Sequence, residues 1–188
     1  GQRAGHMATL REQKRVLEED PLLFWVQEEV INLLSWRIND LEREMYKLIL
    51  GDMELKQMLA LLTGIKGIGK VTARFMIVHT VGFTSFATWR KFASYCGIAP
   101  FPHTSGTSVR GRTRVSRLAN REGKALLHQC SLSAVKCNPE MKAYYERRLE
   151  IGKSKMSTLN IIRNKLVARA FAVVSRGTPY VQLMGHAS

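Results

Sequence analysis

Apolar residues in the first third of the chain recur at the spacing of a helical seam. The positions are separated by alternating steps of three and four residues: Ile31, Leu34, Ile38, Leu41, Met45 and Leu48. This repeat of 3.5 residues is typical of a coiled coil. Because it is only about three heptads long, the pattern fits a helix that associates with a second copy and equally one that packs on its own globule.

Helix-start and helix-stop residues divide the remainder of the chain. Asp20-Pro21 begins the seam helix and Gly51-Asp52 ends it, while Gly177 is a plausible helix C-cap. Further helices are expected over about 54–62, 70–80, 86–95, 120–136, 139–151 and 156–176. Strand-like alternation is nearly absent, and residues 101–117 have an irregular, basic sequence. The sequence therefore predicts an all-α fold, in which a coiled-coil-like helix precedes a helical globule.

These signals give a provisional division into segments. Residues 1–7, GQRAGHM, are typical of what remains after an affinity tag is cleaved. We expect a helical linker over 8–53, a globular domain over 54–180 and a loosely ordered tail over 181–188. No apolar run approaches the roughly 20 residues needed to span a bilayer. The polar run after the tag begins as if within a helix, so we expect the chain to be a piece of a longer protein.

Charge is distributed unevenly along the chain. Of the net charge of +14, residues 1–54 contribute −4, whereas residues 55–188 carry 22 Lys and Arg against 4 Asp and Glu, a net of +18. A globule this basic is expected to bind a polyanion, and nucleic acid is the usual one. The three cysteines, Cys96, Cys130 and Cys137, lack the spacing of a zinc site. We expect them to be buried thiols in a reducing cytoplasm.

A glycine-rich turn joins two of the expected helices. Gly67, Ile68 and Gly69 lie between Lys66 and Lys70, at the start of the second helix. Glycines allow a turn that directs backbone N–H groups to a phosphate at a helix N-terminus. The segment resembles the helix-hairpin-helix motif, which holds a DNA backbone phosphate without reading sequence. The alternative is a tight helix–helix turn without a ligand.

A Ser-Gly pair, Ser105-Gly106, lies in the irregular segment just before a group of arginines: Arg110, Arg112, Arg114 and Arg117. A hydroxyl that attacks a phosphodiester needs cations around it, because negative charge builds up on the non-bridging oxygens. Arginine suits this role, since it can donate two hydrogen bonds to one phosphate. Residue types alone do not separate Ser105 from Ser108 as a nucleophile.

The runs GIAP, SG, VSRLAN and KALL follow in order from Gly97 to Leu127. Together with the glycine turn, they resemble the C-terminal domain of insertion-sequence one-ten type transposases, which are related to the Piv and MooV DNA invertases. The resemblance extends from about Leu61 to Tyr180. The chain departs from it at Ala119-Asn120, where the family has Gly-Asn, and at Gly123-Lys124, where the family has Leu-Arg; Lys124 keeps the positive charge.

The resemblance implies a function and a missing part. In that family the serine of the Ser-Gly pair is the covalent nucleophile, which here is Ser105. An N-terminal RuvC-like domain with four acidic residues (DEDD) binds magnesium and is joined through a coiled coil. We therefore expect no catalytic metal in this chain, and no activity from it alone. Expected partners are DNA, a structured guide RNA and further copies of the chain, as a dimer or tetramer, in a bacterial cytoplasm near the nucleoid.

The expected function is accordingly DNA binding and strand transfer in a bacterial transposase. The expected nucleic-acid contacts are Lys66, Gly67, Ile68, Gly69, Lys70, Gly106, Arg110, Arg112, Arg114, Arg117 and Lys124. The alternative is a non-catalytic DNA- or RNA-binding module that positions nucleic acid for a separate nuclease domain.

Overall fold

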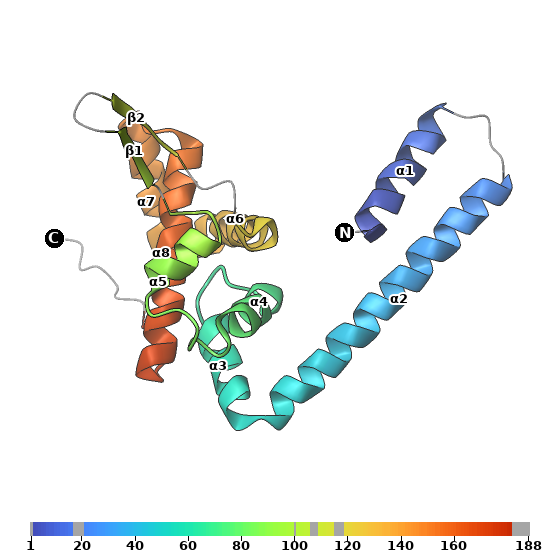
Figure 1. Ribbon diagram of the computed structural model, residues 1–188, viewed down its shortest axis with the longest axis horizontal. Helices are drawn as coiled ribbons and strands as arrows, with labels where there is room; N and C mark the ends of the chain where they lie inside the picture. Colours follow the sequence, from blue (N-terminus) through green and yellow to red (C-terminus); the bar gives the residue numbers. More distant parts are fainter. Residues whose placement is uncertain (1, 17–20, 100, 106–108, 115–118, 182–188) are drawn as a thin grey trace. The chain divides into compact units, whose positions relative to one another are not determined.

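The computed structural model describes residues 2–16, 21–99, 101–105, 109–114 and 119–181, with the two strands as backbone only. The elements are α1 (Gln2–Val16), α2 (Pro21–Gly51), α3 (Met53–Thr63), α4 (Lys70–Thr80), α5 (Trp89–Tyr95), β1 (Phe101–Ser105), β2 (Val109–Arg114), α6 (Arg121–Cys137), α7 (Pro139–Glu150) and α8 (Lys155–Arg176) (Figure 1). They form two compact units, Gly1–Asp52 and Met53–Ser188. No helix in the described ranges combines the length and the apolar character needed to cross a bilayer.

The first unit consists of α1 and α2, which contact each other. α2 begins at Pro21 and ends at Gly51, where the sequence places its two ends. The later seam residues Ile38, Leu41, Met45 and Leu48 are exposed. α1 begins at Gln2 and so includes residues that the sequence analysis set aside as a tag remnant. Self-association through the seam stays a prediction.

The second unit is built around α8, which contacts α3, α5, α6 and α7 (Figure 1). One face of α8 supplies fully buried side chains: Ile162, Leu166, Val167, Ala170 and Val173. Burial of each large apolar side chain on this face stabilises the unit by about 1.5–3 kcal/mol. The predicted helical globule is confirmed.

Local capping sets most of the helix ends in this unit. Asn138 caps α7, which has Pro139 in its first turn, and Gly177 ends α8 in the left-handed conformation with φ of 66°. The helix expected from residue 86 begins at Trp89 instead. Thr88 causes this later start, because its hydroxyl accepts a hydrogen bond from the Lys91 N–H and its backbone is extended.

The segment that the sequence analysis left irregular contains a small antiparallel sheet. β1 pairs with β2 in the register Phe101–Arg114, His103–Gly111, Thr104–Arg110 and Ser105–Val109, with an irregularity between Phe101 and His103. The predicted all-α class is confirmed, and the two-stranded hairpin is an addition to the helical fold.

The cysteines differ from the expectation in one case. Cys96 and Cys130 are buried, but Cys137 is exposed. Cys137 is the last residue of α6, next to the Asn138 cap where the chain turns into α7. The expectation of three buried thiols was therefore wrong for Cys137.

Candidate nucleic-acid interface

The turn between α3 and α4 is fixed from inside the globule. Ile65 and Ile68 are 1% and 4% exposed, and the Ile68 N–H donates to the Ile65 carbonyl at 2.9 Å. Lys66 and Lys70 are exposed on either side. The turn thus has an apolar interior and two lysines at its surface, directly before the first turn of α4.

Gly67 is held tightly against α6. Its φ is +106°, and a Cβ built on it would lie 2.6 Å from the Ala134 Cβ and 3.0 Å from the Cys130 carbonyl oxygen. Both the backbone conformation and the space exclude a side chain at this position. Helix packing therefore accounts for Gly67, whether or not a phosphate binds nearby.

Gly69 has a different environment. Its φ is −88°, its ψ is 170°, and a Cβ there would meet nothing within 4 Å. It is the N-cap of α4 and offers no side chain to cap the helix. The absence of a side chain leaves the positive end of the α4 dipole open to an anion.

Cys130 lies beneath the turn. Burial raises the pKa of the Cys130 thiol, and hydrogen bonding with Thr72 and then with the Gly69 backbone opposes the rise. The distance from Cys130 Sγ to Thr72 Oγ1 is 3.2 Å. The thiol therefore lies in the interior beneath the turn, in contact with Thr72 in the first turn of α4.

Ser105 is the last residue of β1, and its pairing with Val109 is the last before the turn of the hairpin. Across the hairpin, Arg110 pairs with Thr104, the residue before Ser105, and Arg114 pairs with Phe101. Arg112 lies between them in β2, while Gly106, Ser108 and Arg117 lie outside the described residues.

The segment that carries the hairpin is fastened at its far end to α5. The Asn120 N–H donates to the Tyr95 carbonyl, and Asn120 Nδ2 donates to the Tyr95 hydroxyl, each at 2.9 Å. His79 Nδ1 lies 2.9 Å from the same hydroxyl. Asn120 Oδ1 also accepts from the Gly123 N–H at 2.8 Å, which caps α6. One asparagine thus ends the hairpin segment and begins the next helix.

The near end of the segment is fastened to α8. The Ile98 carbonyl accepts from Asn160 Nδ2 at 2.8 Å and from Asn164 Nδ2 at 3.0 Å. Ile98 itself is fully buried. Side-chain hydrogen bonds therefore hold the base of the hairpin segment, at Ile98 and Asn120, to the globule on both sides.

A buried polar group supports this base. Arg163 is 5% exposed, and its Nη2 lies 2.7 Å from His128 Nδ1 while its Nη1 donates to Asn160 Oδ1 at 3.3 Å. Burial, and then the charge of Arg163, lower the pKa of His128. Burial also lowers the pKa of Arg163. His128 in its neutral form accepts the hydrogen bond, and so connects α6 through α8 to the hairpin base.

Gly123 and Lys124 lie in the first turn of α6. A Cβ on Gly123 would lie 2.8 Å from Phe75 Cζ and 3.0 Å from Cys96 Sγ, so α6 approaches α4 too closely for a side chain. Burial raises the pKa of Cys96 to about 12. Lys124 is exposed beside this contact. Gly123 therefore lies at a close contact between α6 and α4, which no single-sequence signal could reveal.

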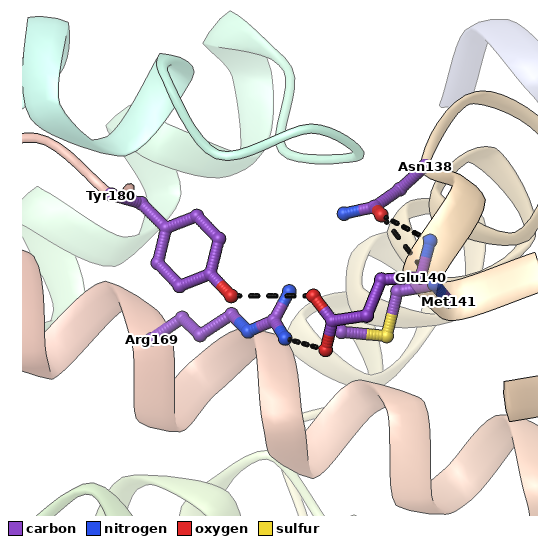
Figure 2. A network of polar contacts seen from close by, with 5 residues as sticks. All are labelled: Asn138, Glu140, Met141, Arg169 and Tyr180. Atoms are coloured by element: carbon purple, nitrogen blue, oxygen red, sulfur yellow. Dashed lines mark hydrogen bonds and ion pairs between the residues drawn. The ribbon is translucent and has the colours of Figure 1, made fainter. Parts of the chain in front are cut away.

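A group of cations on α7 and α8 surrounds one carboxylate, a pairing that the sequence analysis did not predict. Glu140 Oε1 accepts from Arg169 Nη2 at 2.5 Å, and Glu140 Oε2 accepts from the Tyr180 hydroxyl at 3.3 Å (Figure 2). Lys165 Nζ lies 3.7 Å from the centroid of the Tyr144 ring. Burial lowers the pKa of Lys165, with Arg169 and Arg147 acting in the same direction and Glu140 opposing them. A single carboxylate thus lies among several cations and ties Tyr180 to the globule.

Two of the expected nucleic-acid contacts lie at opposite ends of α6. Gly67 lies against Ala134 near the C-terminal end of α6, and Lys124 lies at its N-terminal end.

Within the described residues, no three His, Cys, Asp or Glu side chains come together as a metal site would require.

Comparison with known proteins identifies relatives of this arrangement. The family described as Transposase IS116/IS110/IS902 matches residues 59–146, from α3 into α7. The chain is 30% identical over 132 residues to the Insertion element IS110 uncharacterized 43.6 kDa protein of Streptomyces coelicolor, covering 70% of this chain and 32% of that protein. It is 28% identical over 152 residues to the Pilin gene-inverting proteins of Moraxella bovis and Moraxella lacunata, covering 79% of this chain and 47% of each of them. The chain therefore spans between about a third and about half of the length of these relatives.

Proposed function

Residues 59–146 belong to the Transposase IS116/IS110/IS902 family, and we propose on this basis that the chain is the DNA-binding and strand-transfer part of a bacterial recombinase, with Ser105 as its nucleophile. The position of Ser105 carries the proposal. It ends β1 at the turn of the hairpin, whose base is held to α5 by Asn120 and to α8 through Ile98. Because the chain is held on both sides of the hairpin, Ser105 stays near the globule, where a DNA backbone can reach it.

In the proposed step the Ser105 hydroxyl oxygen forms a bond to a DNA phosphorus atom and loses its proton to a base. The bond from phosphorus to one sugar oxygen breaks, and that oxygen leaves as a hydroxyl. Positive charge from Arg110, Arg112, Arg114 and Arg117 offsets the charge that builds up on the phosphate oxygens. The phosphoserine retains the energy of the phosphodiester, so another sugar hydroxyl can later displace Ser105.

We also propose that the turn between α3 and α4 acts as a helix-hairpin-helix phosphate site. The open environment of Gly69 and the exposure of Lys66 and Lys70 support this. Contacts of this kind position DNA without reading its sequence. The turn would hold the substrate while Lys124 and the arginines of the hairpin surround the reacting phosphate.

The proposed reaction needs partners beyond this chain. We expect a separate RuvC-like domain to bind magnesium through four acidic residues, and a structured RNA to guide the choice of target. The exposed seam of Ile38, Leu41, Met45 and Leu48 supports a dimer or tetramer formed through α2. Such a recombinase would work on the bacterial nucleoid in the cytoplasm.

The test is a trapping experiment in the complete recombinase, which joins this chain to the acidic domain. A nicked DNA substrate that cannot be religated should accumulate a covalent protein–DNA adduct that resists SDS. Ser105→Ala should lower the adduct by at least about a thousandfold without lowering DNA affinity. Ser108→Ala is the matched control and should leave the adduct nearly unchanged. If the adduct persists in Ser105→Ala, the nucleophile is a different residue, and the non-catalytic positioning module becomes the better interpretation.

A further inference from the structure

A pocket of about 510 Å³ lies between α5 and the start of the hairpin segment on one side and α8 on the other. The lining residues that matter here are Trp89, Arg90, Ala93, Ala99, Asn160 and Asn164. This volume falls within the range of small-molecule sites, about 300–1,000 Å³. The lining contains one cationic residue and no acidic one. The pocket therefore suits a small ligand that is neutral or is attached to an anion.

The pocket shares its wall with the base of the hairpin. Asn160 and Asn164 line it, and the same two amides hold the Ile98 carbonyl. Ala99 lines it as well and precedes Ser105 by six residues. An extended chain of that length reaches at most about 20 Å. A ligand in the pocket thus lies within about six nucleotide steps of Ser105, at 3.4 Å for each step.

The chemistry of the lining matches a nucleobase. Trp89 provides an indole ring, and the Arg90 guanidinium carbon lies 4.7 Å from the ring centroid, where it adds positive charge at the wall. Both N–H groups of the Asn164 amide are already used, one on the Ile98 carbonyl and one on the Asn160 carbonyl at 2.8 Å. The side chain of Asn164 can therefore offer a ligand only its oxygen, an acceptor for an exocyclic amino group of a base.

We propose that this pocket binds one unpaired nucleobase of the DNA on which Ser105 acts. The inference rests on the proposed function, because only a nucleic acid held at the hairpin brings bases to this wall. Bases that leave the helix stack on aromatic side chains and are recognised by a few polar groups. The net charge of +18 over residues 55–188 favours a polyanion as the source of the base over an apolar peptide.

The test uses Trp89 as its own reporter. The chain has three tryptophans, and Trp25 and Trp36 are exposed on α2 at 56% and 52%. The double variant Trp25→Phe, Trp36→Phe leaves Trp89 as the single tryptophan. We titrate it with a short duplex that carries one bulged 2-aminopurine, with the fully paired duplex and with a duplex whose bulge is abasic. The bulged base should quench Trp89 fluorescence, and the two control duplexes should not.

Affinity gives the second readout. Trp89→Ala should weaken binding of the bulged duplex by about tenfold and leave the paired duplex within about twofold, while Trp89→Phe should keep most of the preference. Ser94 of α5 also lines the pocket and is only half-buried. Ser94→Leu should therefore fill the pocket and abolish the preference even if Trp89→Ala folds poorly. Equal weakening of both duplexes, an unchanged Trp89 signal on binding, or no binding of either duplex would overturn the proposal.

The two proposals fail separately. Ser105→Ala in this chain should leave the preference for the bulged duplex intact, because the pocket does not use the hydroxyl. Loss of the preference in the pocket variants, with the covalent adduct still dependent on Ser105, is the result expected if both proposals hold. A covalent adduct that persists in Ser105→Ala contradicts the nucleophile and leaves the result on the pocket standing.

Discussion

Gly67 and Ala134 approach so closely that a methyl group on the glycine would lie 2.6 Å from the Ala134 side chain. Gly69, two residues on, has open space where its side chain would be. The two glycines of one turn thus have separate roles: the first permits α6 to pack, and the second leaves the start of α4 accessible.

Single alanine substitutions should separate these roles. Gly67→Ala should lower the free energy of unfolding by about 2–4 kcal/mol, because it adds a clash to a left-handed backbone. Gly69→Ala should lower it by less than about 1 kcal/mol, yet weaken DNA binding at least about fivefold by obstructing the phosphate. Urea denaturation and DNA titration measure the two effects. A Gly69→Ala variant that binds DNA as tightly as the parent chain would remove the phosphate role from the turn.

Tyr95→Phe tests the anchor of the hairpin. The change removes the hydroxyl that contacts both His79 and Asn120 and keeps the ring, so stability should fall by only about 1 kcal/mol. We expect the rate of adduct formation in the complete recombinase to fall more than DNA affinity does, since the hairpin base loosens while the binding surface remains. Tyr144→Phe, which keeps the ring beneath Lys165, is the control and should change neither quantity.

His128 makes stability depend on pH in a definite direction. In the unfolded chain its imidazole takes up a proton near the ordinary pKa of 6.5, whereas burial and Arg163 lower that pKa in the folded chain. The unfolded state therefore binds more protons as the pH falls below about 6.5. Stability is complete above that pH and declines below it. His128→Gln keeps an acceptor for Arg163 without a proton to gain, so its unfolding free energy should decline less between pH 7 and pH 5. Urea denaturation measures both proteins at each pH. An equal fall in unfolding free energy for the parent chain and for His128→Gln would contradict this role.

Glu140→Gln tests the contact that holds Tyr180, which follows α8, to α7. Arg169, whose side chain is 14% exposed, loses its counter-charge, and the free energy of unfolding should fall by about 1–2 kcal/mol. Faster amide exchange at Tyr180 should accompany it. Glu146→Gln breaks the exposed pair with Lys142 and should change stability by less than about 0.5 kcal/mol. Equal effects of the two changes would mean that Glu140 contributes no more than a surface charge.

The elements marked by local chemistry were the ones that the sequence predicted well. Pro21, Asn138-Pro139 and Gly177 mark helix ends that need only a few neighbouring residues to form. The sequence did not predict the hairpin at Phe101–Arg114, because arginines and a glycine replace the apolar alternation of a buried strand. These strands form through their pairing with each other and not through residue propensity. Tertiary contacts explain the other differences. The reasons for Gly67 and Gly123, and the exposure of Cys137, depend on where α6 packs.

α6 joins the two regions that the proposed function needs. Gly123 contacts α4 beside the hairpin base, and Ala134 lies under the glycine turn, eleven residues further along one continuous helix. At a rise of 1.5 Å per residue these two points are about 16 Å apart, and a packed helix does not stretch. In the proposed function, a DNA that contacts both Lys124 and the glycine turn would therefore span a separation that this packed helix keeps constant.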